Sequence, residues 1–165
     1  MKPKLYLETT IPSYLTARPA RDPLMAGKLA ATKKWWRLRR KYFELFASQL
    51  VLDEAARGDA GAARRRHVIL APLPLLPITT EAIDLAGKIQ AKHLLPPGAN
   101  DDVLHIATAT VNEAHFLLTW NCHHINNGEI LPAVQRLERF HKLCSLQLAG
   151  GGGKVGDASH PCAGA

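Results

Sequence analysis

The chain has 165 residues with a formal net charge of +7, and 47% of its residues are hydrophobic and 21% charged. This length suits one domain, and the composition excludes a wholly disordered chain and a disulfide-dense mini-protein. The positive charge favours a polyanionic partner, with nucleic acid ahead of an acidic membrane surface.

The first third of the chain predicts two strands separated by helix. Lys4–Leu7 is a short apolar run that ends at a polar cluster, which is typical of a strand, and a brief helical turn opens at Pro12. A long helix is predicted over Leu24–Tyr42, and a second strand over Phe43–Ala47. The side chains expected on the inward face of the long helix are Leu24, Lys28, Ala31, Trp35, Leu38 and Tyr42.

Two capped helices and a short strand follow. Ser48 is a suitable N-cap for a helix over Gln49–Arg57, and Asp59 is suitable for one over Ala60–Leu70. Leu75–Ile78 predicts a small strand, and Pro77 within it favours a position at the edge of the sheet.

The remaining elements are separated by clear breaks. A helix is predicted from Thr79 or Thr80 to about His93, and the residues Pro-Pro-Gly at 96–98 end that region.

A helix from Asn100 or Asp101 to about Glu113 is followed by a strand over His115–Thr119. Ile130–Leu143 predicts a last amphipathic helix, after which Cys144–Leu148 can supply part of a strand. We expect one domain over residues 1–148 and a glycine-rich disordered tail over 149–165.

Short strands that alternate with helices predict an α/β fold, with a central parallel sheet between two helical layers. Sites in such folds lie at the carboxyl ends of the strands. Two polar clusters occupy such positions, one over Glu8–Thr10 and the other over Thr119–Asn121. The search for chemistry therefore starts at these two clusters.

Five carboxylates lie near element boundaries: Glu8, Asp53, Glu54, Asp101 and Asp102. Gathered at one edge of a sheet, such groups suit Mg²⁺ or Mn²⁺, which can activate water for phosphodiester cleavage. Each has a plainer interpretation. Asp101 and Asp102 can simply complement a helix dipole. Asp53 and Glu54 lie within one short helix, where one carboxylate is expected to face solvent. A charge at the end of a core strand, as at Glu8, needs a partner.

Four segments in order resemble a PIN domain. They are Leu5–Leu15 (LYLETTIPSYL), Leu50–Asp59 (LVLDEAARGD), Asp102–Ala109 (DVLHIATA) and Leu117–Asn127 (LLTWNCHHINN). The resemblance covers roughly residues 4 to 140 and belongs to the branch with a long second helix. PIN domains are three-layer α/β/α sandwiches, many are Mg²⁺- or Mn²⁺-dependent ribonucleases, and the bacterial VapC toxins are the largest group.

The resemblance implies a role for each matched residue. Glu8, Glu54 and Asp102 take the positions of metal-binding acids, Thr9 that of the small hydroxyl residue, and Asn121 that of a fourth acid. Glu8 stands where most of the family has aspartate, and the asparagine brings no negative charge. These departures imply weaker metal affinity and a slower enzyme.

A basic surface is expected on the long helix, formed by Lys33, Lys34, Arg37, Arg39, Arg40 and Lys41. Interleaved aromatic residues (Trp35, Trp36, Tyr42) suit RNA binding through stacking and phosphate contacts. The alternative is a solvated helix in which at least one tryptophan packs inward. Arg64–Arg66 is interpreted as a solvated helix face.

Other polar side chains have plain interpretations. His105 is expected in the core or beside the site rather than as a catalytic base, and His123 and His124 as exposed loop residues. The three cysteines have no metal-binding spacing, which favours reduced thiols in a cytoplasmic protein. No apolar run is long enough to span a membrane, and no signal peptide is expected.

The sequence therefore predicts a metal-dependent endoribonuclease, with RNA as substrate, an antitoxin-like protein as a possible partner, and a homodimeric state. One alternative is a degenerate, non-catalytic PIN domain that binds RNA or a protein partner. Another is a structural module that binds an antitoxin through its long helix.

Overall fold

The computed structural model describes residues 1–93, 95–96, 98–121, 123–125 and 143–145. Five parallel strands form one sheet in the order β3-β2-β1-β4-β5. The strands are β1 Lys4–Leu7, β2 Glu44–Ser48, β3 Leu75–Leu76, β4 Phe116–Thr119 and β5 Leu143–Ser145. The helices are α1 Thr10–Thr16, α2 Pro23–Leu38, α3 Gln49–Ala56, α4 Ala60–Leu70, α5 Thr80–Ala91 and α6 Asn100–Val111, with a 3₁₀ turn, η1, at Arg40–Tyr42.

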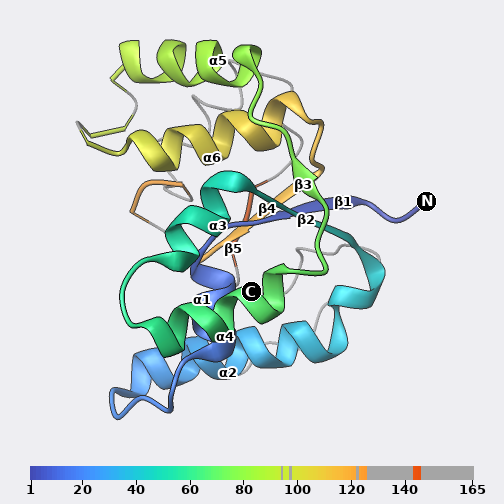
Figure 1. The fold of residues 1–165 in the computed structure, drawn as a ribbon, viewed down its shortest axis with the longest axis vertical. Helices are drawn as coiled ribbons and strands as arrows, with labels where there is room; N and C mark the ends of the chain where they lie inside the picture. Colours follow the sequence, from blue (N-terminus) through green and yellow to red (C-terminus); the bar gives the residue numbers. More distant parts are fainter. Residues whose placement is uncertain (94, 97, 122, 126–142, 146–165) are drawn as a thin grey trace, which may run out of the picture.

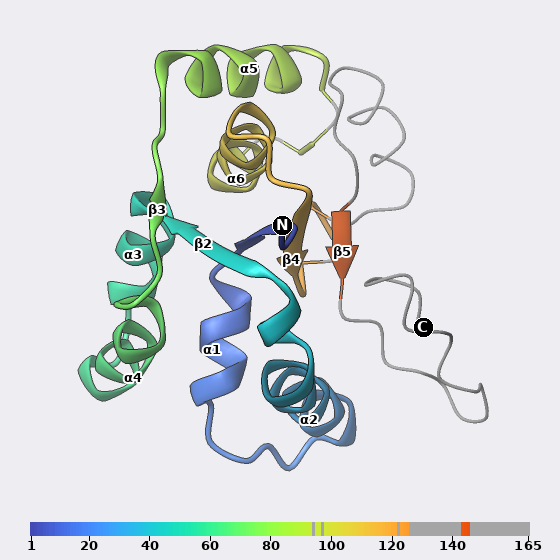
Figure 2. The ribbon, with the colours of Figure 1, turned by 90° about the vertical axis from the view of Figure 1, so that its right-hand side faces the viewer.

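Helices cover both faces of the sheet (Figure 1). Figure 2 shows α5 and α6 on one face and α1 and α2 on the other, with α3 and α4 beside the β3 edge. The central strand β1 alternates between these two layers, as a strand buried on both faces must. Tyr6 belongs to the hydrophobic cluster under α3, α5 and α6, whereas Leu5 and Leu7 belong to the cluster under α1 and α2.

Three predicted helix starts are confirmed by their caps. The side chains of Ser48, Asp59 and Thr79 each accept a hydrogen bond from the backbone N–H three residues further on. Such a bond satisfies an amide that has no partner inside the helix. The short β3 strand lies at the edge of the sheet, where the proline at position 77 is tolerated.

The inward face predicted for the long helix is only partly confirmed: Trp35 is buried and Ala31 packs against the core, but Leu24 is exposed. Its helix ends at Leu38 rather than Tyr42, and both of these residues are exposed, by 45% and 54%. The buried side chains of α2 are Leu29, Thr32 and Trp35. On this face the Trp120 indole N–H, from the loop after β4, donates to the buried Thr32 hydroxyl at 2.8 Å. One inward tryptophan, Trp35, agrees with the alternative drawn from the sequence.

The C-terminal prediction is partly corrected. Leu143 is paired with Leu117 in parallel strand β5 and is not the end of a helix, so the sheet extends one strand beyond β4. Residues 130–142 of the predicted last helix and the expected tail lie outside the described residues. Within the described part of the chain, no helix has the length and apolar character needed to cross a bilayer.

Candidate functional site

Glu8 follows β1 directly and is 5% exposed. Its Oε2 accepts hydrogen bonds from the Thr10 backbone N–H at 3.1 Å, the Thr10 hydroxyl at 2.5 Å and the Thr119 hydroxyl at 2.8 Å. The first of these donors belongs to the opening turn of α1, where backbone amides lack helical partners. The carboxylate is therefore fixed at the carboxyl ends of the two central strands, β1 and β4, where we expected it.

Glu54 reaches the same place from α3. It accepts a hydrogen bond from the Thr9 hydroxyl, and its Oε2 lies 3.0 Å from Nε2 of His105. Its neighbour Asp53 is exposed and accepts a hydrogen bond from Gln49. The structure thus distinguishes the two adjacent acids, because only Glu54 turns toward β1.

His105 lies on α6 and is 1% exposed. Its Nδ1 lies 2.8 Å from the Tyr6 hydroxyl, which in turn lies 2.7 Å from the hydroxyl of Ser48. A chain of polar contacts thus runs from the end of β2 through β1 to α6, and reaches Glu54. This histidine is in the core and also contacts the candidate site, so the expectation from the sequence was correct but incomplete.

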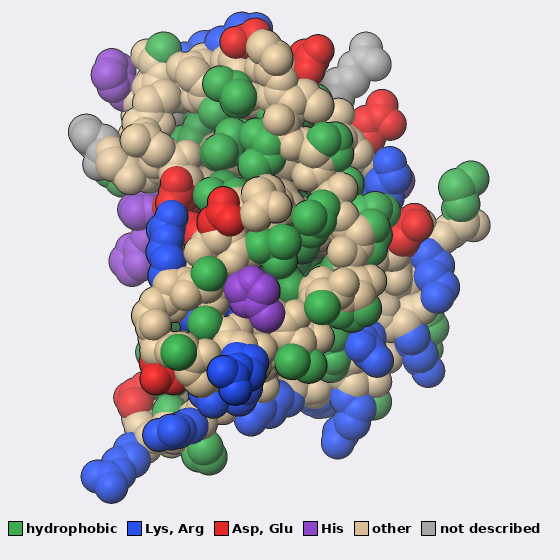
Figure 3. Space-filling view, in the orientation of Figure 1, with side chains coloured by type: hydrophobic (Ala, Val, Ile, Leu, Met, Phe, Trp, Pro, Cys, Tyr) green, Lys and Arg blue, Asp and Glu red, His purple; other side chains and the backbone are tan. Residues whose placement is uncertain are grey.

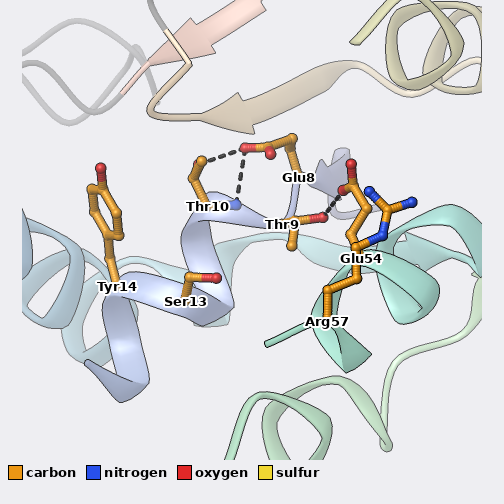
Figure 4. A pocket seen from close by; sticks show the side chains of 7 residues that line it. All are labelled: Glu8, Thr9, Thr10, Ser13, Tyr14, Glu54 and Arg57. Atoms are coloured by element: carbon orange, nitrogen blue, oxygen red, sulfur yellow. Dashed lines mark hydrogen bonds between the residues drawn. The ribbon is translucent and has the colours of Figure 1, made fainter. Parts of the chain in front are cut away.

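An open pocket of about 320 Å³ lies beside these groups. Its lining residues are Glu8, Thr9, Thr10, Ser13, Tyr14, Glu54 and Arg57, shown in Figure 4. Glu8, Glu54 and His105 each offer one ligand atom, and these atoms all lie within 4.8 Å of one another. We call these three residues the Glu–Glu–His cluster. Two carboxylates and an imidazole at this spacing can hold a divalent cation.

The two carboxyl groups of the cluster have opposite pKa shifts. Burial raises the pKa of Glu8 above its usual range, although the charge of His105 and hydrogen bonds from Thr10 and Thr119 oppose the shift. Burial also acts to raise the pKa of Glu54, but the hydrogen bond and charge of His105, together with Thr9 and Arg57, lower it overall. Burial raises the pKa of Tyr6, so its hydroxyl keeps its proton at neutral pH. An ionised Glu8 therefore needs a nearby cation.

Asp102 lies in the first turn of α6 and belongs to a neighbouring group. Its Oδ1 accepts a hydrogen bond from the Asn121 amide at 2.8 Å, and its Oδ2 lies 2.6 Å from Nδ1 of His124. Asn121 also donates its backbone N–H to Thr119, whose hydroxyl holds Glu8. The structure therefore links Asp102 and Asn121 to Glu8 through hydrogen bonds, while neither supplies a ligand atom to the Glu–Glu–His cluster.

Two of the remaining predictions concern charged residues near this site. Asp101 is exposed and forms an ion pair with Arg57 at 3.3 Å, on the rim of the pocket. His124 was expected as an exposed loop residue, but it is half-buried and contacts Asp102. Arg57 was not expected at the site, although it caps the end of α3 three residues after Glu54.

The basic surface lies away from the pocket. It ends at η1, which precedes the amino end of β2, whereas the pocket lies at the carboxyl ends of the parallel strands. Its residues are exposed except for Arg39, which is half-buried. The Arg40 guanidinium stands 4.8 Å from the Trp36 ring centre, and Lys and Arg side chains gather along the α2 side in Figure 3. Arg57 is the cation among the described residues that line the pocket.

The second basic run, Arg64–Arg66, is only partly a solvated face. Arg64 and Arg65 are exposed, but the Arg66 guanidinium donates to the backbone carbonyls of Ala55 at 2.9 Å and Arg57 at 2.6 Å. These carbonyls belong to the end of α3, where helical partners are missing. Arg66 therefore holds the carboxyl end of the helix that carries Glu54.

No model of a known protein family matches the sequence, and no curated protein is significantly similar to it. Among solved structures, the chain is similar to one in the crystal structure of VapBC2 from Rickettsia felis bound to a DNA fragment from their promoter. The TM-score is 0.56 at 16% sequence identity, and the match covers 86% of this chain and 97% of that chain. At this identity the likeness shows the fold alone, which is a three-layer α/β/α sandwich of the PIN type.

Proposed function

We propose that the protein is a metal-dependent endoribonuclease of the PIN and VapC type, which hydrolyses phosphodiester bonds in RNA. The observation that carries the proposal is the meeting of Glu8 and Glu54 in one pocket at the carboxyl ends of parallel strands. These residues come from segments 46 positions apart and converge in a fold similar to that of a VapBC2 chain. Parallel α/β folds bind their substrates at this edge.

The donor set fits a hard divalent cation such as Mg²⁺ or Mn²⁺, because it is rich in carboxylate oxygen. Glu8, Glu54 and Asp102 would hold one or two ions. Bound there, the metal would supply an activated water and neutralise charge on the phosphate.

The surrounding residues would position these ligands and the substrate. Thr9 orients Glu54 through its hydroxyl, and Asn121 orients Asp102 through its amide. Arg57 on the pocket rim provides a positive charge for a phosphate of the RNA. The basic surface on α2 and η1 would bind more distant parts of the same RNA, because it ends near the amino end of β2 and the pocket lies at the carboxyl ends of the strands.

Three further features belong to this proposal. The similar chain comes from VapBC2, so we propose that this protein also binds a small antitoxin-like partner. We further propose that it is a homodimer and that it acts in the cytoplasm. RNA of unknown sequence is the proposed substrate.

The test is cleavage of structured RNA by purified protein in the presence of Mn²⁺, with Asp102→Asn as the comparison. We expect cleavage by the wild-type protein and its loss in the variant, since the substitution removes a negative charge beside the pocket. Equal cleavage by both proteins would contradict the proposal. Circular dichroism of the variant checks that the fold is retained.

A non-catalytic PIN domain is the second candidate. It is favoured by one observation, namely that both carboxylate oxygens of Asp102 are already bonded to Asn121 and His124. Calorimetric titration with Mn²⁺ separates the two candidates. A non-catalytic domain would show no binding that depends on Glu8 and Asp102, and would retain binding of RNA or of an acidic partner protein.

A further inference from the structure

We propose that His105 is a direct ligand of the divalent cation in this pocket, and that its imidazole makes the site prefer a first-row transition ion such as Mn²⁺ to Mg²⁺. This inference rests on the proposed function only in requiring that the pocket binds a metal. The resemblance to PIN domains assigns the metal to acidic residues, so a histidine ligand goes beyond what the resemblance implies.

The spacing of the ligand atoms fits coordination. Nε2 of His105 and Oε2 of Glu54 are 3.0 Å apart, and one oxygen of Glu8 lies within 4.8 Å of both. Two adjacent ligands of an octahedral ion, each at about 2.1 Å, are themselves about 3.0 Å apart. An ion can therefore replace the direct contact between imidazole and carboxylate without a large movement of either side chain.

The hydrogen bonds of Glu8 leave one of its carboxylate oxygens available to a cation. All three of its hydrogen bonds are made to Oε2, and among the described residues none donates to Oε1. The side chain is nevertheless 95% buried, at 5% exposure. Oε1 is not a fully buried atom but is open to the pocket, so water or a cation can occupy the position beside it. Figure 4 shows the Glu8 carboxylate turned toward Thr10 and bonded to it through one oxygen.

Tyr6 and Ser48 hold His105 as outer partners hold a metal-binding histidine. Such histidines use one ring nitrogen for the metal and donate the other N–H to a fixed acceptor. Here Nδ1 lies 2.8 Å from the Tyr6 oxygen, and Tyr6 lies 2.7 Å from Ser48. Because hydroxyl hydrogens can rotate, Nδ1–H can donate to Tyr6 while Tyr6 donates to Ser48. With Nδ1–H given to Tyr6, Nε2–H donates to Glu54 in the metal-free protein, and a metal ion would take the place of that proton on Nε2.

The mixed donor set determines the metal preference. Mg²⁺ favours oxygen ligands and dehydrates reluctantly, whereas imidazole binds transition ions well. Two carboxylates and one imidazole therefore favour Mn²⁺ and its heavier neighbours. A purely acidic site would favour Mg²⁺ much more strongly than this one does.

The experiment measures metal binding without RNA. Full-length protein is freed of metal with a chelator and titrated calorimetrically with Mn²⁺ and with Mg²⁺. The variants are His105→Gln and Glu8→Gln, with His67→Gln as a matched control on α4. Pulsed electron paramagnetic resonance of the Mn²⁺-loaded wild-type protein detects coupling to an imidazole nitrogen directly.

We expect His105→Gln to weaken Mn²⁺ binding by at least about 10- to 100-fold, since loss of an outer partner of a ligand already has an effect of this size. Mg²⁺ binding should change far less, because an amide oxygen suits this ion. Glu8→Gln should weaken both ions, and His67→Gln neither. Nitrogen coupling should be present in the wild-type spectrum.

Unchanged Mn²⁺ affinity in a folded His105→Gln protein, or a wild-type spectrum without nitrogen coupling, would overturn the inference. The spectrum decides the matter alone if the variant does not fold. Transition-ion preference without RNA cleavage would contradict the proposed function and leave this inference intact. RNA cleavage that proceeds equally well with Mn²⁺ and Mg²⁺ would support the proposed function and contradict this inference.

Discussion

The Tyr6 hydroxyl offers the sharpest test of the polar chain beneath the pocket. Tyr6 is fully buried, and its hydroxyl lies within hydrogen-bond distance of both Ser48 and His105. Tyr6→Phe removes only this oxygen and keeps the ring that packs in the core. It leaves two buried polar atoms without one of their partners, and each loss costs about 1–3 kcal/mol.

We expect a decrease of about 2–4 kcal/mol in the free energy of unfolding, because Ser48 keeps a second bond, from the Val51 N–H. The measurement is urea denaturation followed by tryptophan fluorescence. Tyr42→Phe is the matched control, since Tyr42 is exposed and a surface change of this kind stays within about 0.5 kcal/mol. The reasoning would be refuted if Tyr6→Phe were as stable as this control.

A double-mutant cycle sharpens the same test. Ser48→Ala alone removes both the helix cap on Val51 and the partner of Tyr6. If the two hydroxyls act together, the double variant should be more stable than the sum of the single losses predicts, by about 0.5–3 kcal/mol. Simple additivity would show that Tyr6 and Ser48 contribute independently.

Three other changes test separate contacts. Thr32→Val leaves the buried Trp120 N–H without its acceptor, so unfolding free energy should fall by about 1–3 kcal/mol, measured by chemical denaturation. Arg66→Met should cost about 1 kcal/mol and more than Arg64→Met, because only Arg66 holds the end of α3; equal melting curves would contradict this. Burial raises the pKa of Glu8, so its protonation stabilises the fold below the ordinary glutamate pKa, and that stability is lost as pH rises through the raised value. Stability curves of metal-free protein should therefore fall with rising pH in this window, and Glu8→Gln should remove that fall.

The sequence predicted the parts of the fold that local chemistry determines. Ser48, Asp59 and Thr79 cap their helices as expected, because an N-cap depends only on the next three residues. The strand at Lys4–Leu7 was equally clear, since a central parallel strand is continuously apolar.

The face of α2 could not be predicted in the same way. Its buried face includes Thr32, which is bonded to Trp120, 88 positions away in the sequence. A helix with charges on most sides has no strong apolar stripe, so periodicity placed exposed Leu24 and Leu38 inside. The buried face of α2 therefore depends on contacts between residues that are far apart in the sequence.

The candidate site shows the same division. Glu8 and Glu54 could be named from position and resemblance, and the structure brings them together. The contacts of His105 could not be predicted from the local sequence, because its partner Tyr6 lies on a strand 99 positions earlier. The pairing of Asp102 with His124 depends on the path of the loop after β4, which the sequence does not specify.

The buried carboxylate of Glu8 suits metal binding but lowers the stability of the metal-free fold. Three hydrogen bonds fix one oxygen of this carboxylate, yet burial still raises its pKa. A glutamine of the same shape would keep one acceptor oxygen and lose the buried charge, so the metal-free fold should gain stability from the exchange. A residue that costs stability and faces a pocket is best explained by the ligand it binds, because functional sites are where such costs are retained. Glu8→Gln should therefore raise the stability of the metal-free protein and lower its affinity for Mn²⁺.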